Sequence, residues 1–199
     1  MQYYSTNGQA PIADLRKAVV KGLAEDRGLY MPERINKLSK VFFDNIHTMS
    51  FQDIAFNVAE AFFGEDIDAD ELQDLVNDTL SFDCPVVKVQ ENIYSLELFH
   101  GLTLAFKDVG ARFMARLLRH FNDQEKQVNV LVATSGDTGS AVANGFLGVE
   151  GVHVYVLYPK GKVSPIQECQ FTTLGHNITA VEVDGVFDDC QALVKSAFM

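Results

Sequence analysis

Three short apolar runs alternate with helical patterns along the second half of the chain, and this alternation restricts the fold more than any other feature. The first of these runs is nearly continuous in apolar residues, as in a strand that is buried on both faces of a parallel sheet. The predicted strands are Val128–Ala133, Val152–Leu157 and Ile178–Val183, and the predicted helices after them are Thr138–Leu147, Val163–Leu174 and Phe187–Phe198. Such alternation predicts an α/β fold, a three-layer sheet with right-handed crossovers.

The first 84 residues have a different, mostly helical pattern. Apolar residues recur at helical spacing over 12–23, 50–63 and 68–80. Ser50 and Asp53 are spaced as in a capping box at the start of the second helix, and Gly64 ends it. The runs Val86–Val89 and Ile93–Leu98 then predict a hairpin, and Lys107–Phe121 a helix. We therefore predict a mostly helical N-terminal domain over 1–84 and the first part of an α/β domain over 85–199.

The composition argues against several kinds of partner. Lys and Arg number 16 and Asp and Glu 27, for a net charge of −11, and no basic stripe is present that would bind nucleic acid. Cys84, Cys169 and Cys190 are widely spaced, which disfavours a disulfide framework or a zinc site and fits a reducing compartment. No apolar run reaches membrane-spanning length, and no signal-peptide pattern opens the chain. We expect a cytoplasmic protein without a nucleic-acid, membrane or metal partner.

Lys107 closes the apolar segment LFHGLTLAFKD and stands at the start of a predicted helix. Lysines favour the opposite end of a helix, because the helix dipole is positive at the N-terminus. The dipole and burial among apolar neighbours both disfavour the ammonium form and so favour a nucleophilic amine. These neighbours are Leu102, Leu104, Ala105 and Phe106. On spacing alone, a snorkelling lysine at the edge of an element is the better interpretation.

A second segment, VLVATSGDTGSAVANGF, joins a predicted buried strand to a predicted helix through small residues. Small residues let the backbone approach a ligand, and the first N–H groups of a helix can bind an anion. The loop lies at the carboxyl end of a strand, where open α/β sheets bind their ligands. It is neither a Walker A loop nor a G-x-G-x-x-G loop. A plain turn with Asp137 or Thr138 as N-cap is an equally good interpretation.

Taken together, the two segments resemble the fold-type II, tryptophan-synthase-β-like enzymes that use pyridoxal 5′-phosphate (PLP). In that group an apolar run ending in Lys precedes a strand and the motif T-S-G-[D/N]-T-G. Within the group the chain is similar to the threonine synthase family along essentially its whole length. The motifs that carry this resemblance are YYSTNGQAP, GLAEDRGLYMPE, ELFHGLTLAFKDVGARFMARLL, VATSGDTGSAVANGF, YPKGKVSPIQE and TLGHNITAVEVDGVFDDCQALVKSAF. The related dehydratases and cysteine synthases lack the first of these motifs.

The resemblance implies a role for five residues. Lys107 matches the catalytic lysine of the family, which binds PLP through a Schiff base. Asp137 matches a cofactor-binding position near the 3′-oxygen of PLP, where many relatives have Asn. Thr134, Ser135 and Thr138 match the loop that binds the substrate. No metal is implied.

The activity implied by the resemblance is the conversion of O-phospho-L-homoserine and water to L-threonine and phosphate, by a monomer or a homodimer. Two alternatives stay open, namely a phospho-lyase that releases phosphate and an oxo acid, and a non-catalytic α/β binding module. The last helical pattern reaches the end of the chain without a closing Gly or Pro, so we expect the N-terminal part of a longer protein. The family's contacts to the PLP phosphate and pyridine nitrogen would then lie beyond residue 199. Residues 1–199 alone are expected to bind PLP weakly and to be inactive.

Overall fold

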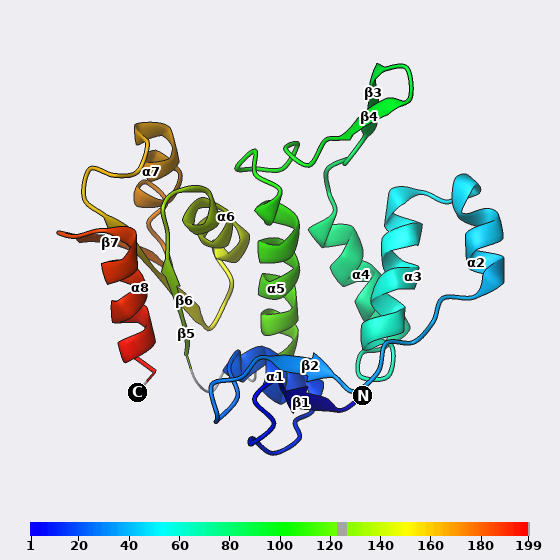
Figure 1. Cartoon of the computed structure of the whole chain (residues 1–199), viewed down its shortest axis with the longest axis horizontal. Helices are drawn as coiled ribbons and strands as arrows, with labels where there is room; N and C mark the ends of the chain where they lie inside the picture. The colour runs from blue at the N-terminus through cyan, green and yellow to red at the C-terminus, as the bar shows by residue number, and fades with distance from the viewer. Residues whose placement is uncertain (123–126, 199) are drawn as a thin grey trace. The chain divides into compact units, whose positions relative to one another are not determined.

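The computed structural model describes residues 1–122 and 127–198 (Figure 1). The chain divides into two compact units, Met1–Ser81 and Phe82–Met199. The domain boundary that the sequence predicts, between residues 84 and 85, stays a prediction.

A small antiparallel sheet opens the first unit. Strand β1 (Tyr3–Ser5) pairs with β2 (Tyr30–Pro32), and helix α1 (Leu15–Lys21) lies between them in the sequence. The carboxylate of Asp14 caps α1 by accepting a hydrogen bond from the N–H of Lys17 at 2.7 Å. The sequence predicted the helix but not the sheet, because strands of three residues are too short to show an alternating pattern.

Helices make up the rest of the first unit. They are α2 (Lys40–Asn45), the 3₁₀ helix η1 (Ile46–Thr48), α3 (Phe51–Phe63) and α4 (Ala69–Thr79). The predicted capping box of α3 is confirmed, since Ser50 Oγ accepts from the N–H of Asp53 at 3.0 Å and the Asp53 carboxylate accepts from the N–H of Ser50 at 3.2 Å. Helices α3 and α4 pack against each other, and α4 buries Leu72, Leu75 and Val76.

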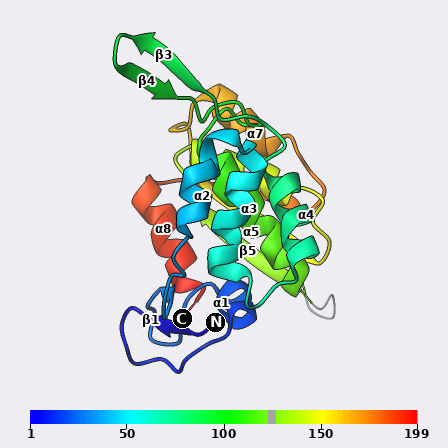
Figure 2. The ribbon, with the colours of Figure 1, turned by 90° about the vertical axis from the view of Figure 1, so that its right-hand side faces the viewer.

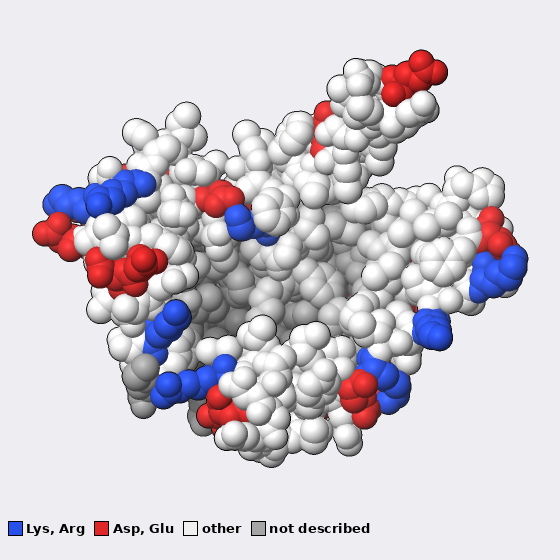
Figure 3. Space-filling view, in the orientation of Figure 1, with Lys and Arg blue, Asp and Glu red and all other residues white. Residues whose placement is uncertain are grey.

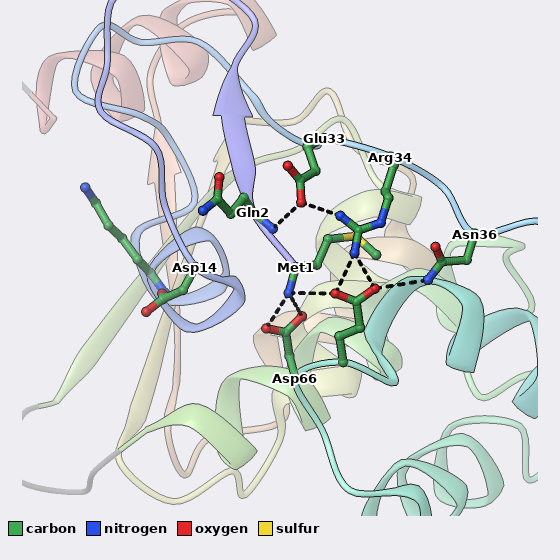
Figure 4. Close-up of polar contacts among 9 residues, drawn as sticks. Met1, Gln2, Asp14, Glu33, Arg34, Asn36 and Asp66 are labelled. Carbon is green, nitrogen blue, oxygen red and sulfur yellow. Dashed lines mark hydrogen bonds and ion pairs between the residues drawn. The ribbon is translucent and has the colours of Figure 1, made fainter.

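The α-amino group of Met1 lies in a cluster of charged side chains (Figure 4). Met1 has a side chain only 1% exposed, and its α-amino group donates to both carboxylate oxygens of Asp66 at 3.1 Å and lies 3.5 Å from Glu65. Arg34 joins Glu65, at 2.7 Å, to Glu33, at 2.6 Å. The hydrogen bond to Asp66 raises the pKa of the α-amino group above its ordinary value. These charges therefore tie the start of the chain to the turn after α3.

The second unit begins with the predicted hairpin, which is confirmed. Strands β3 (Val86–Gln90) and β4 (Ile93–Leu96) are antiparallel, and the turn between them contains Asn92 at φ 60°. Asn adopts this left-handed conformation more readily than most residues. The apolar side chains of the hairpin are exposed, namely those of Val86, Val87, Val89, Ile93, Tyr94 and Leu96.

A parallel sheet forms the centre of the second unit and confirms the predicted α/β architecture. Its strands, in the order β5-β6-β7, are β5 (Val128–Ala133), β6 (Val152–Pro159) and β7 (Ile178–Val183). The helices are α5 (Lys107–Phe121), α6 (Asp137–Phe146), α7 (Pro165–Thr172) and α8 (Phe187–Ser196). Helices α6 and α7 pack on one face of the sheet, as right-handed crossovers require, and α8 covers the other (Figures 1 and 2).

The register of the sheet brings the carboxyl ends of its strands to one edge. Ala133 lies opposite Leu157, and Leu157 lies opposite Val181, so the loops after the three strands leave from the same side. The central strand supplies the core, with Val154 and Val156 fully buried. Since ligands of such sheets bind at the carboxyl edge, the loop after β5 is a candidate binding site.

Candidate active site

The hydroxyl group of Thr134 organises the loop after β5. Thr134 is fully buried, and its Oγ1 accepts hydrogen bonds from the N–H groups of Gly136 at 2.9 Å and Gly139 at 2.8 Å while donating to the carbonyl of Gly136 at 3.1 Å. Gly136 has φ 148°, a conformation that glycine tolerates best. A Cβ atom on Gly139 would collide with the side chain of Thr134. The small residues of this motif are therefore needed because the backbone folds tightly around one threonine.

Lys107 and Asp137 meet at the N-terminus of α6, although 30 residues separate them in the sequence. Lys107 is the first residue of α5, which packs beside α6 (Figure 1). Its Nζ lies 2.6 Å from Oδ2 of Asp137, and Oδ1 of the same carboxylate accepts from the N–H of Thr138 at 3.0 Å. The hydrogen bond from Lys107 lowers the pKa of Asp137 below its ordinary value. One carboxylate thus joins the lysine to the first turn of α6.

The surroundings of Lys107 differ from the prediction. The sequence predicts burial among apolar neighbours, but Leu102, Leu104 and Phe106 are 67%, 69% and 59% exposed, and the side chain of Lys107 is 31% exposed. The segment before Lys107 is an irregular loop in which Leu104 has φ 61° and Thr103 is buried. The predicted apolar burial of Lys107 is therefore wrong, and an ion pair with a carboxylate takes its place.

The other predicted site residues lie on the same loop. Ser135 is exposed, and Thr138 is partly buried at the second position of α6. Their predicted role in binding substrate, and that of Asp137 in binding cofactor, stay predictions. The hydroxyl group of Thr134 is engaged within the loop, and the predicted role of this residue in binding substrate also stays a prediction.

Helix α7 braces this loop through residues that the sequence analysis did not select. The side chain of Gln167 lies so close to Gly136 that a Cβ atom there would overlap it. The carbonyl of Gln167 accepts from Oγ of Ser140 at 3.2 Å, and Ser164 Oγ accepts from the N–H of Gln167 at 3.4 Å. The sequence marks the start of α7 at Ser164-Pro165, but it does not indicate that the helix contacts the loop after β5. A contact such as that between Ser140 and Gln167, 27 residues apart, leaves no mark on local spacing.

The structure describes residues 1–122 and 127–198, and neither a metal cluster nor a membrane span occurs in these ranges. No group of three His, Cys, Asp or Glu residues in these ranges is arranged to hold a metal ion. None of the helices in these ranges combines the length and the apolar character needed to cross a membrane. On the face shown in Figure 3, acidic and basic side chains are interspersed.

Known proteins match the chain along its full length. The family model described as "Threonine synthase N terminus" matches residues 2–80. Threonine synthase of Escherichia coli (strain K12) is 43% identical over 198 residues, which make up 100% of this chain and 46% of that protein.

Solved structures agree with the sequence match. The crystal structure of threonine synthase from Escherichia coli has a TM-score of 0.91 at 43% identity and matches 100% of this chain and 46% of that one. The X-ray structure of PLP-bound threonine synthase from Brucella melitensis has a TM-score of 0.90 at 38% identity, over 100% of this chain and 44% of that one. The chain thus spans about half the length of the relatives that it matches. Because sequence and structure agree over all of that span, the chain belongs to the threonine synthase family.

Proposed function

We propose that the whole protein converts O-phospho-L-homoserine and water to L-threonine and phosphate, with PLP as cofactor. The observation that carries this proposal is the 2.6 Å contact between Lys107 Nζ and Asp137 Oδ2. It brings together the two motifs that the family's chemistry requires, one with the amine and one with the anion-binding helix start. Membership of the threonine synthase family and the PLP-bound relative from Brucella melitensis support the proposal.

The groups around Lys107 fit PLP. An aldehyde needs a primary amine that it can reach, and the side chain of Lys107 is 31% exposed. Anionic groups are favoured at the N-terminus of α6, because the helix dipole is positive there. Gly136 and Gly139 keep the loop free of side chains at positions where a Cβ atom would collide with its neighbours. Asp137, in contact with Lys107 Nζ, is in reach of a cofactor that the lysine holds.

Each residue of the site then has a separate task. When bound, PLP supplies an aldehyde that takes up amines and a ring that draws electrons from the substrate. Lys107 Nζ holds the cofactor and, once released, moves protons at the α- and β-carbons of the substrate. Asp137 orients Nζ, while the hydroxyl groups of Ser135 and Thr138, near the positive end of the α6 dipole, bind anionic groups of the substrate. Phosphate leaves the γ-carbon, the γ-carbon takes up a proton, and water adds at the β-carbon. The α-carbon regains its proton, so O-phospho-L-homoserine and water give L-threonine and phosphate.

The setting of the enzyme is also part of the proposal. We infer a small-molecule substrate, a monomeric or homodimeric enzyme and a cytoplasmic location. The cysteines support the location, since Cys84, Cys169 and Cys190 are free and cytosolic proteins seldom form disulfides.

The test uses the protein encoded by the complete reading frame, incubated with PLP and O-phospho-L-homoserine. Phosphate and amino-acid products are measured together. Lys107→Ala is the variant, and Lys40→Ala is its matched control, because Lys40 is 86% exposed on α2 and forms an ion pair with Asp44 on the same helix. We expect equal amounts of phosphate and threonine from the unchanged protein and from Lys40→Ala, and none from Lys107→Ala.

Other products would change the assignment. Phosphate together with an oxo acid would identify a phospho-lyase, which leaves the role of Lys107 intact but refutes the synthase. No turnover, combined with the absence of a borohydride-stable PLP adduct on Lys107, would favour a non-catalytic binding module.

A further inference from the structure

A buried carboxylate lies next to Lys107 and has no part in the proposed chemistry. Asp108 is 2% exposed and accepts two hydrogen bonds from Thr103, one from its N–H at 2.8 Å and one from its Oγ1 at 2.5 Å. Thr103 is itself buried, with 6% exposure. Hydrogen bonds to an ionised acceptor are stronger than those between neutral groups. The pair therefore ties the irregular loop firmly to the start of α5.

The start of α5 has no side-chain cap. The residue at the N-cap of α5, Phe106, makes no capping hydrogen bond with its side chain. The carboxylate of Asp108, in the first turn, instead folds back onto the loop that precedes the helix. Because Lys107 lies between these two residues, the same hydrogen bonds that order the first turn also set the direction in which its side chain leaves.

The surrounding residues allow little freedom at this point. A Cβ atom on Gly101 would overlap the carboxylate of Asp108, so the loop passes directly over it. Leu104 is held at φ 61°, a conformation that a non-glycine residue keeps only where its surroundings impose it. The carbonyl of Thr103 accepts from Nε2 of Gln170 on α7 at 3.3 Å. Helix α7 thus braces both the loop before Lys107 and the loop that carries Asp137.

We infer that Thr103 and Asp108 are positioning residues, which hold Lys107 Nζ against Asp137 by fixing the first turn of α5. The inference rests on the proposed function in one respect, namely that Lys107 is the amine that binds PLP. Neither residue contacts the Nζ atom in the described structure, so their effect is on its placement. Loss of the Thr103 hydroxyl group should let the lysine leave the ion pair and reach the cofactor in a less favourable geometry.

Two measurements on the protein from the complete reading frame test this inference. The first is the rate at which borohydride traps PLP on Lys107. The second is the acetylation of Lys107 by acetic anhydride relative to that of Lys40, read by mass spectrometry, which involves no PLP. The variants are Thr103→Val, which keeps the shape but loses the hydroxyl group, and Thr103→Ser, which keeps it.

We expect opposite changes in Thr103→Val. Trapping of PLP should slow roughly tenfold, the effect of losing one hydrogen bond to a charged group. Acetylation of Lys107 relative to Lys40 should rise roughly twofold to fivefold, the range that a partly exposed ion pair supports. Thr103→Ser should restore both values, which a general loss of stability would not predict.

Unchanged trapping and acetylation in Thr103→Val would overturn the inference. If that variant does not fold, Asp108→Asn is measured by the same criteria. In the unchanged protein, rapid exchange of the Thr103 amide proton would also refute the hydrogen bond from Thr103 to Asp108 on which the inference depends. A failure of PLP to form any adduct with the unchanged protein would refute the cofactor proposal alone, because the acetylation ratio would still report on the position of Lys107.

Discussion

Replacing Thr134 by valine tests whether one hydroxyl group holds the active-site loop. Valine has nearly the same shape, so the substitution removes the hydrogen bonds and leaves the packing almost unchanged. Thr134 is fully buried, and its Oγ1 is the acceptor for the N–H groups of Gly136 and Gly139, at 2.9 Å and 2.8 Å. The carbonyl of Gly136 keeps other donors, since it also accepts from the backbone and the hydroxyl group of Ser140 at 3.1 Å. The substitution therefore strands two buried donors and no acceptor.

The expected loss follows from those two donors. A buried donor without a partner costs about 1–3 kcal/mol, and some relaxation of the loop reduces the sum, so Thr134→Val should lower the free energy of unfolding by about 2–4 kcal/mol. Thr134→Ser keeps the hydroxyl group and removes one methyl group, for which about 1 kcal/mol is expected. The ordering of the two variants, with valine worse than serine, is the sharper part of the prediction.

Urea unfolding followed by circular dichroism gives the two free energies. Amide hydrogen exchange adds a local readout, because the N–H groups of Gly136 and Gly139 should exchange faster in Thr134→Val than in Thr134→Ser. A valine variant as stable as the serine variant, with both amides still protected, would refute the account of how this loop is held.

Two further predictions concern the backbone of the loop and the start of the chain. Gly136→Ala should lower the free energy of unfolding by about 1–3 kcal/mol, because φ 148° is unfavourable for alanine and the new Cβ would overlap Gln167. Gly161→Ala is the control, since Gly161 has φ 64° and open space around its Cβ position, and it should lose less stability in the same urea assay. An equal loss of stability in the two variants would contradict the prediction. The raised pKa of the Met1 α-amino group means that its contribution to stability is complete below its ordinary pKa of 8.0 and is lost as the pH rises through the raised pKa. The free energy of unfolding should therefore fall as the pH rises above 8.0, and it should fall less in Asp66→Asn. Parallel curves for the two proteins would remove the ion pair from the explanation.

Much of the fold was predictable because its elements are marked locally. Strand β5 and helix α5 begin and end where the apolar runs and helical spacing predict them. The capping box of Ser50 and Asp53 depends on residues three apart, which the sequence shows directly. The pair β1 and β2 was missed, because its strands have three residues each and are joined across 24 intervening residues.

The site was predictable as a set of residues but not as an arrangement. The motifs around Lys107 and Asp137 were identified from residue types and order, and the resemblance to threonine synthases assigned their roles. The exposure of Leu102, Leu104 and Phe106 contradicts the prediction, since apolar character does not tell which way an irregular loop turns its side chains. The sequence also could not predict that the Thr134 hydroxyl group forms its hydrogen bonds within its own loop, because its partners depend on the path of the backbone.

The sequence by itself determined most of the secondary structure and the family, and it predicted Lys107 as the reactive lysine, because each of these depends on neighbours within a few turns or on motifs that keep their order. Tertiary structure alone decided that Lys107 faces a carboxylate, that the buried carboxylate of Asp108 accepts hydrogen bonds from Thr103, and that α7 contacts both loops. The physical reason is distance along the chain. Lys107 and Asp137 are 30 residues apart and Thr103 and Gln170 are 67 apart, and only the packing of α5, α6 and α7 brings such groups within hydrogen-bonding distance.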